Sequence, residues 1–289
     1  MFLSWSHISG SLASRLNGFR HLRTKLTVLS AALFGAILLL ISMAVYLAIS
    51  NAAQHQVRSE LIASGTVFDR VWSLRSDQLR QGAALLSRDF GFRAAVATGD
   101  QATIISAMDN LRSRFRIDLA FIVGVDGTIT ASETGRISPH AQTLLTALSA
   151  SSDPAGVFAL DGLPYQMVAV PILSPDLVGW VVFASRLDAN ELSALERLAA
   201  IPLHASVVQP SGNTWVTSDS MGLGDHRELN RFVESALAAK VRGPRTLKSR
   251  AGAAIALIKP LPSLATSDGA ALLLTYPLAK ALAPYRPLP

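Results

Sequence analysis

The feature that most constrains this chain is an uncharged run of 25 residues at positions 26–50. An α-helix rises 1.5 Å per residue, so about 20 apolar residues cross the hydrocarbon core of a bilayer. The run is therefore long enough to span a membrane with some tilt. A cleaved signal peptide is the alternative, but its apolar core is usually about 7–15 residues long. We predict a transmembrane helix over residues 26–50, with the lipid bilayer as a partner.

The charges beside this run predict its direction. Residues 1–25 contain four basic residues and no acidic one, whereas both signs follow position 50. Basic flanks stay on the cytoplasmic side, so residues 1–25 are expected in the cytoplasm and the rest outside. The same tail explains much of the net charge of +6, because the remaining chain has 22 basic and 20 acidic residues. A nucleic-acid-binding protein would carry its basic patch on the folded part, and we exclude that class.

A long amphipathic helix is predicted directly after the membrane run, from about residue 52 to residue 88. Its apolar residues form one stripe along the helix and are Leu61, Phe68, Trp72, Leu79, Ala83 and Leu86. The stripe fits two uses that the sequence does not separate. It can pack on a sheet of its own chain, and it can contact a second copy in a homodimer.

Beyond this helix, one order of strands and helices occurs twice. The first cycle has helices at 100–114 and 139–150, a hairpin at 118–132, and strands at 156–160, 163–172 and 178–187. A connecting helix at 188–200 leads to a shorter cycle, with strands at 203–209, 214–217, 245–248, 254–260 and 270–276 and a helix at 227–241. The pair Asp126-Gly127 predicts a type I′ turn, in which both residues have positive φ. We expect antiparallel sheets with helices covering one face.

This plan resembles the double Cache (PAS-like) sensor region of bacterial transmembrane signalling proteins. The resemblance rests on the basic tail, the membrane run and the long helix, and on DQATIISAMDNLRSRF (100–115), DLAFIVGVDGTITAS (118–132), VAVPI (168–172) and VGWVVFASRLD (178–188). It covers roughly residues 26–285 and is strongest to the regions that precede GGDEF or GGDEF–EAL domains, which make or degrade cyclic di-GMP. It implies an α+β fold in which the transmembrane helix leads into a long helix and two PAS-like subdomains.

The resemblance also implies a division of the chain and a location. Residues 51–188 hold the long helix and a membrane-distal subdomain, residues 189–283 a smaller membrane-proximal subdomain, and residues 284–289 a truncated lead-in to a second transmembrane helix. The protein is expected in the bacterial inner membrane as a single pass, with its folded domain in the periplasm. A GGDEF or EAL motif, a HAMP linker and a second span are missing from the sequence. No catalytic residue of those domains therefore has a position here, and we expect no enzyme.

The sequence carries no pattern of metal, cofactor or catalytic chemistry. None of the six histidines has metal-like spacing to another, and cysteine is absent. The segment Gly222-Leu223-Gly224 lacks the third glycine and the lysine of a phosphate loop. There is also no G-x-S-x-G motif. We expect no cofactor and no metal.

A small-molecule pocket is the better-supported site. In PAS-like domains it lies between the curved sheet and the helices on its face. Strand alternation places Phe121 on one inner face and Tyr165 with Met167 on another, while Arg114 and Arg116 precede the first strand and suit an anionic group. Phe121 and Met167 also fit a plain core, and the arginines a solvated helix end. Tyr165 is favoured because a buried tyrosine hydroxyl needs a partner.

Three functions stay open at this point. The first is a sensory input module that regulates cyclic di-GMP turnover in its full-length form, or that serves a histidine kinase or a chemoreceptor. Its ligand is unknown, since the Tyr, Arg, Trp and Asp signature of amino-acid-binding Cache domains is not recognisable. The second is an envelope scaffold that docks a partner protein, and the third is an extracytoplasmic enzyme.

Overall fold

The structure, a computed structural model, describes residues 22–212, 214–217, 226–239, 243–249, 252–265 and 269–278. The chain divides into two compact units, Met1–Gln54 and His55–Pro289. The expectations for residues 1–21, for the glycine-containing segment at 222–225 and for the lead-in at 284–289 lie outside the described residues.

Helix α1, Leu22–Arg88, contains both the expected membrane helix and the amphipathic helix that follows it. Every side chain at positions 26–49 is exposed, as suits a segment that meets lipid instead of a protein core. Within the part of the chain that the structure describes, α1 is the one helix long and apolar enough to cross a membrane. Its apolar window has a mean hydropathy of 2.6.

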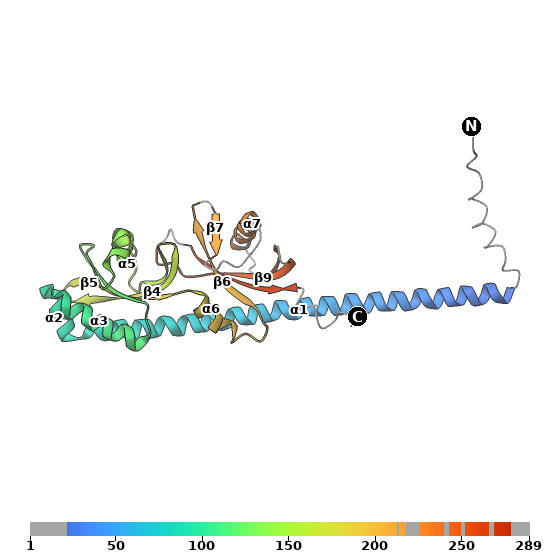
Figure 1. The fold of residues 1–289 in the computed structure, drawn as a ribbon, viewed down its shortest axis with the longest axis horizontal. Helices are drawn as coiled ribbons and strands as arrows, with labels where there is room; N and C mark the ends of the chain where they lie inside the picture. The colour runs from blue at the N-terminus through green and yellow to red at the C-terminus, as the bar shows by residue number, and fades with distance from the viewer. Residues whose placement is uncertain are drawn as a thin grey trace, which may run out of the picture. The chain divides into compact units, whose positions relative to one another are not determined.

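The first subdomain has a five-stranded antiparallel sheet with strand order β2-β1-β5-β4-β3. Figure 1 shows its strands β4 and β5 in the same part of the molecule as α5. Its strands are β1 Leu119–Gly124, β2 Ile129–Ala131, β3 Ala155–Leu160, β4 Leu163–Leu173 and β5 Leu177–Arg186. Its helices are α2 Phe90–Thr98, α3 Gln101–Phe115, α4 Thr134–Ile137, the short 3₁₀ helix η2 Ser138–His140 and α5 Ala141–Ser149.

The second subdomain repeats this sheet with the order β7-β6-β10-β9-β8. Helix α6, Ala189–Glu196, connects the two cycles. The remaining elements are β6 His204–Ser211, β7 Thr214–Thr217, α7 His226–Leu237, β8 Arg245–Ser249, β9 Gly252–Pro260 and β10 Ala271–Pro277. In both cycles the second strand lies at one edge and the third at the other. The α+β fold with two antiparallel sheets is therefore confirmed.

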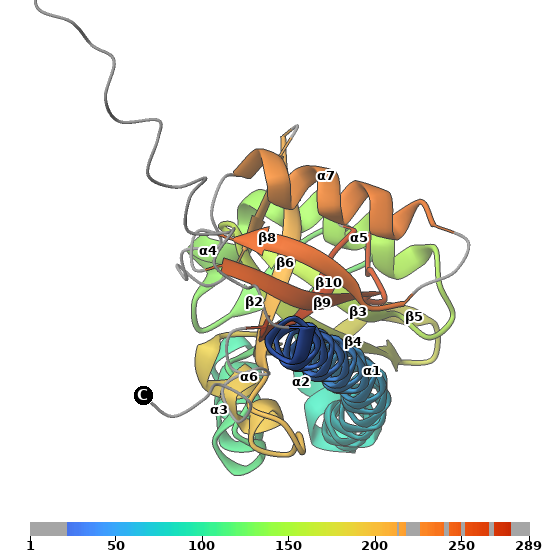
Figure 2. The ribbon, with the colours of Figure 1, turned by 90° about the vertical axis from the view of Figure 1, so that its right-hand side faces the viewer.

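Helices cover both faces of the two sheets, so the expectation of one covered face is wrong. In the first subdomain, Leu79 of α1 and Met108 of α3 pack on one face, and Leu144 and Leu148 of α5 on the other. Figure 2 shows α1 on one side of the strands and α5 and α7 on the other. A strand covered on both faces is buried almost without interruption. This explains why β5 reads as a continuous apolar run rather than an alternating one.

The two Asp-Gly turns differ from each other. At Asp161 and Gly162 both φ angles are positive, 51° and 75°, as a two-residue type I′ hairpin requires. At the first hairpin only Gly127 has a positive φ, 83°, so the type I′ turn expected there is wrong. Asp126 instead accepts hydrogen bonds through Oδ1 from the backbone N–H of Thr128 at 3.0 Å and its hydroxyl at 2.7 Å. Such a side-chain turn needs no positive φ at the aspartate.

The apolar stripe of α1 packs on sheets of its own chain. Leu61 and Phe68 belong to the core of the second sheet, and Leu79, Ala83 and Leu86 to the core of the first. One helix therefore carries both subdomains. A second copy of the chain would have to contact a different face of α1.

Candidate ligand-binding site

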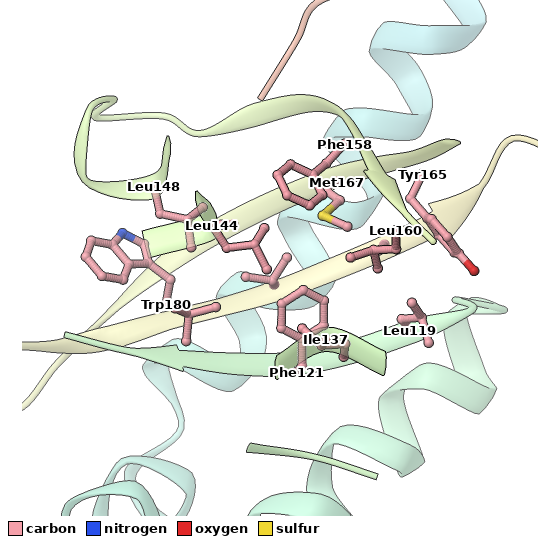
Figure 3. Packing of buried hydrophobic residues seen from close by; sticks show 14 of the residues in the cluster. Leu119, Phe121, Ile137, Leu144, Leu148, Phe158, Leu160, Tyr165, Met167 and Trp180 are labelled. Atoms are coloured by element: carbon pink, nitrogen blue, oxygen red, sulfur yellow. The ribbon is translucent and has the colours of Figure 1, made fainter. Parts of the chain in front are cut away.

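Three of the five residues expected at the site lie together between the first sheet and α4–α5. Phe121 on β1 and Tyr165 and Met167 on β4 belong to one buried cluster, with Leu144 of α5 and Phe158 of β3. Figure 3 shows Tyr165 at the margin of this cluster, with its hydroxyl directed away from Met167. Phe121, Phe158 and Met167 are almost completely buried. The core behind Tyr165 is therefore filled by side chains, and a ligand enters it only if these move.

Arg114 and Arg116 lie elsewhere. Both are exposed at the end of α3, where Arg116 ends the helix with a φ of 54°. The buried residues of α3, Ile104 and Met108, pack on the opposite face of the sheet from Tyr165. The five expected residues therefore do not form one site.

The arginine that does reach Tyr165 is Arg136 in α4. Its Nη2 donates a hydrogen bond to the Tyr165 hydroxyl at 3.2 Å. Its other nitrogens face Asp161 Oδ2 at 3.5 Å and Glu133 Oε2 at 3.4 Å. The Tyr165 hydroxyl, followed by these two carboxylates, raises the pKa of Arg136 above its ordinary value. Arg136 therefore places a permanent positive charge beside the one polar atom of the buried tyrosine.

His140 completes this polar rim. Its Nε2 lies 3.9 Å from Asp161 Oδ1, and its ring meets Phe158 edge-on with the ring centroids 5.9 Å apart. The rim, which we define as Glu133, Arg136, His140, Asp161 and Tyr165, thus combines hydrogen-bond donors and acceptors at the margin of an apolar core. Small-molecule sites have this composition, in which apolar walls provide area and a few polar groups fix orientation.

Sequence reasoning missed Arg136 because its partner is 29 residues away. The segment 133–138 has no periodic pattern, and the helix expected there begins only at the proline. No local signal marks this arginine. Only its position, between the second strand and the helix that covers the sheet, relates it to the rim.

Strand β4 connects the rim directly to α1. Tyr165 faces the rim, and the next residue, Gln166, faces α1 with 3% of its surface exposed. The side-chain N–H of Gln166 donates to the Trp72 carbonyl at 3.2 Å and to the Ser76 hydroxyl at 2.8 Å. A movement of β4 at Tyr165 would therefore act on α1 through the neighbouring residue.

The register partner of Gln166 on β5 makes a second contact with the same helix. Ser185 pairs with Gln166, and its hydroxyl accepts a hydrogen bond from Arg75 Nη2 at 2.9 Å. Arg75 also reaches Glu191 Oε1 of α6 at 3.4 Å. Residues 72–76 of α1 are thus tied to the sheet by polar contacts that lie between the two apolar contact regions of the helix.

Metal chemistry has no candidate in the described ranges. They contain no group of three or more His, Asp or Glu side chains that could hold a metal ion. The pair of His204 Nδ1 and Glu196 Oε1, 2.8 Å apart, lies in the second subdomain and provides only two ligands.

Comparison with known proteins places this geometry in a family. Residues 54–243 match the family described as the double sensory domain of two-component sensor kinases. No curated protein matches the chain. Similar solved structures have low sequence identity to this chain, so they show the fold alone.

One such structure is the domain of a protein assigned to the sensory box/GGDEF family of Vibrio parahaemolyticus, with a TM-score of 0.54, 11% identity, and 81% of this chain and 99% of that one covered. Another is the sensory domain of the Campylobacter jejuni chemoreceptor Tlp3, with a TM-score of 0.51, 9% identity and coverage of 81% and 98%. A third is the ligand-binding domain of the Pseudomonas fluorescens chemoreceptor CtaA in complex with L-isoleucine, with a TM-score of 0.50, 12% identity and coverage of 82% and 97%.

These proteins serve different outputs, so cyclic di-GMP is not singled out among them. The resemblance to double Cache sensor regions is confirmed. The family match covers well over half of the chain. It includes the C-terminal part of α1, the whole first subdomain and the second subdomain as far as α7. The chain therefore belongs to the double Cache family of sensory domains of signalling proteins.

Proposed function

We propose that this chain is the periplasmic input part of a bacterial transmembrane signalling protein and that its ligand binds at the rim around Arg136 and Tyr165. The observation that supports this most is that two neighbouring residues of β4 contact different parts of the protein. Tyr165 accepts a hydrogen bond from Arg136 at the rim, and Gln166 donates one to α1. The basic flank before the apolar run supports a cytoplasmic N-terminus and a folded domain on the other side of the membrane.

The ligand we propose is a small molecule with an anionic group and an apolar part. Arg136 is paired with Glu133 and Asp161, whose side chains are about half exposed. A ligand carboxylate can replace these two surface partners and use the planar, two-pronged geometry of the guanidinium. The apolar part would enter between α5 and the sheet. A cationic ligand would instead pair with the two carboxylates.

In the full-length protein we propose that the output is cyclic di-GMP turnover. The sequence resemblance is strongest to regions that precede GGDEF or GGDEF–EAL domains, and one similar structure comes from a sensory box/GGDEF family protein. The alternative outputs are a histidine kinase and a chemoreceptor. Cellular cyclic di-GMP, measured with and without expression of the full-length protein, distinguishes the three outputs. Its concentration should change only if the output is cyclic di-GMP turnover.

A thermal-shift screen of the full chain in detergent tests the ligand proposal. It should include amino acids, organic acids, polyamines and nucleobases. A ligand that binds only the folded state adds about 2.7 kcal/mol of stability at a hundredfold excess over Kd. Tyr165→Phe and Arg136→Gln should abolish the shift, while Arg114→Gln on the opposite face should keep it. If no compound shifts the midpoint, the rim is not a ligand site.

A homodimer through α1 is part of the proposal, on a face that the sheets leave free. Val67, Leu74 and Leu85 are exposed, and their spacings of 7 and 11 residues keep them on one side of the helix. The chain has no cysteine, so Leu74→Cys gives a single thiol. A disulfide-linked dimer should form under mild oxidation. Ser73→Cys, an exposed position about 100° around the helix from Leu74, is the matched control and should stay monomeric. A monomer in both variants would argue against this contact.

The scaffold alternative has one observation in its favour. Phe90 at the start of α2 and Leu173 and Leu177 beside the β4–β5 turn are exposed. Arg93 Nη1 donates to the Leu173 carbonyl at 3.3 Å and so joins these two segments. If the ligand screen finds nothing, loss of signalling on Phe90→Ser with an unchanged unfolding midpoint would favour docking of a partner at this end.

A further inference from the structure

A segment of the second subdomain extends the sheet of the first. Residues 262–264, which we call the edge segment, follow β9 and lie alongside β3. The Val157 N–H donates to the Pro262 carbonyl at 2.7 Å, and the Leu264 N–H donates to the Val157 carbonyl at 2.9 Å. Val157 and Ser263 form a parallel β-bridge. The edge segment therefore acts as a short sixth strand on a sheet whose other strands come from the first cycle.

The contact leaves no space for a side chain at Gly156 of β3. A Cβ built on Gly156 would lie 2.6 Å from the Leu264 nitrogen and 2.6 Å from the Ser263 carbonyl carbon. Both are backbone atoms and cannot rotate away. The next residue, Ala265, is buried in the cluster that contains Phe121 and Met167. A residue of the second subdomain thus belongs to the core behind the rim.

A second contact holds the turn between β3 and β4. Gln209 on β6 is buried, and its side-chain N–H donates to the carbonyl of Gly162. Gly162 directly follows Asp161, which faces both Arg136 and His140 of the rim. The β3–β4 hairpin is therefore held by the second subdomain at its outer edge and at its turn.

This hairpin also carries the rim residues Asp161 and Tyr165. We propose that the edge segment and Gln209 form a clamp that couples ligand binding at the rim to the second subdomain. A ligand that moves Tyr165 or draws Arg136 away from Asp161 must move the hairpin, and the hairpin cannot move without its clamp. The ligand part of this inference rests on the proposed function, whereas the coupling does not.

Hydrogen exchange of the full chain in lipid nanodiscs tests the coupling. Gly156→Ala should displace the edge segment and speed exchange of the Val157 and Leu264 amides by about tenfold, because each loses its carbonyl partner. Coupling free energies act in both directions, so exchange should also rise in residues 134–137 and 163–165. Gly243→Ala is the matched control, since a Cβ there meets no atom within 4 Å and the residue lies outside both contacts and both readout segments.

A second variant keeps the test decisive if Gly156→Ala does not fold. Gln209→Leu preserves the size of the side chain and removes the donor to Gly162. In Gln209→Leu, exchange should again rise in residues 163–165. Tyr165→Phe tests the opposite direction, because it changes the first subdomain and should raise exchange at residues 261–265 of the second. The clamp is overturned if each variant changes exchange only at its own contact and leaves the remote segment unchanged.

The outcomes separate the two proposals. If no compound in the ligand screen binds but each variant changes exchange in the other subdomain, the clamp is supported and the ligand site is rejected. If a carboxylate ligand binds and exchange at residues 204–211 and 261–265 is the same with and without it, the ligand site stands and the clamp falls. Equal thermal shifts in the wild type and in Gly156→Ala would also count against the clamp.

Discussion

The core position of Met167 predicts a large loss of stability on truncation. Met167→Ala removes a fully buried side chain from a packed cluster and should lower the free energy of unfolding by about 2–5 kcal/mol. Leu173→Ala on the same strand removes an exposed side chain and should change it by less than about 0.5 kcal/mol. Urea denaturation measures both. Equal effects would mean that the cluster is not closely packed.

The neighbours Tyr165 and Gln166 show what a local rule can predict at the residue scale. Alternation along a strand is such a rule, and it correctly places Tyr165 and Met167 on one face and Gln166 on the other. The partner of the tyrosine does not follow from any such rule. Arg136 is brought to it by the fold, whereas the arginines that stand out in the sequence, Arg114 and Arg116, lie on a helix that packs on the opposite face.

The start of α3 predicts a pH-dependent contribution to stability. The Thr103 hydroxyl and N–H lower the pKa of the Asp100 carboxylate below its ordinary value of 3.8. Because the folded pKa is lower than the unfolded one, this stabilisation is present above pH 3.8 and is lost as the pH falls through the folded pKa.

Removing the hydroxyl checks this cause. In Thr103→Val the pKa of Asp100 should rise toward 3.8 in an NMR titration of the carboxylate. Thr98→Val is the control, since the Thr98 hydroxyl donates to the Ala94 carbonyl and not to a carboxylate. An unshifted Asp100 in Thr103→Val would show that the hydroxyl does not lower the pKa.

At the scale of elements, the local sequence pattern predicts most helices and strands, whereas it predicts few of the contacts in the candidate site. Helix caps, apolar periodicity and turn residues depend on a few neighbours, and both five-stranded cycles follow from them. Asp126-Gly127 shows the limit, because the same dipeptide forms a type I′ turn at Asp161-Gly162 and a different turn here. The coverage of both sheet faces also cannot be predicted from local pattern, because α1 and α3 pack on a sheet whose strands come later in the sequence.

The tie between β4 and α1 predicts a cost for removing one side chain. Gln166→Leu leaves the Ser76 hydroxyl without its buried donor and should lower the free energy of unfolding by about 1–3 kcal/mol. Gln78→Leu changes an exposed residue on the same helix and should have little effect. Chemical denaturation followed by circular dichroism compares the two. A neutral Gln166→Leu would mean that the hydrogen bonds of Gln166 do not help to hold α1 to this sheet.

At the scale of the whole molecule, the contacts that join the subdomains are the least predictable. Val157 and Ser263 are separated by more than 100 residues, and neither carries a signal for pairing. The two cycles are visible in the sequence, but their mutual attachment is decided by packing after both have formed. The resemblance to a family gives the general arrangement and not these particular contacts.

The proposed topology predicts opposite labelling of the two ends of the chain. Leu198→Cys introduces an exposed thiol in the folded domain, and Ser14→Cys places one before the apolar run. A membrane-impermeant maleimide should label the first in intact spheroplasts and the second only after lysis. Labelling of both in intact spheroplasts would contradict the cytoplasmic tail, and labelling of neither would contradict the periplasmic domain.

The edge segment has one consequence for solubility. An uncovered edge strand exposes unpaired N–H and C=O groups and invites pairing with another molecule, which is a route to aggregation. In the first sheet β2 is only three residues long, and β3, the opposite edge, is covered by residues 262–264. The second subdomain therefore shields its neighbour from edge-to-edge association, and a chain cut before this segment would leave β3 open as a template for aggregation.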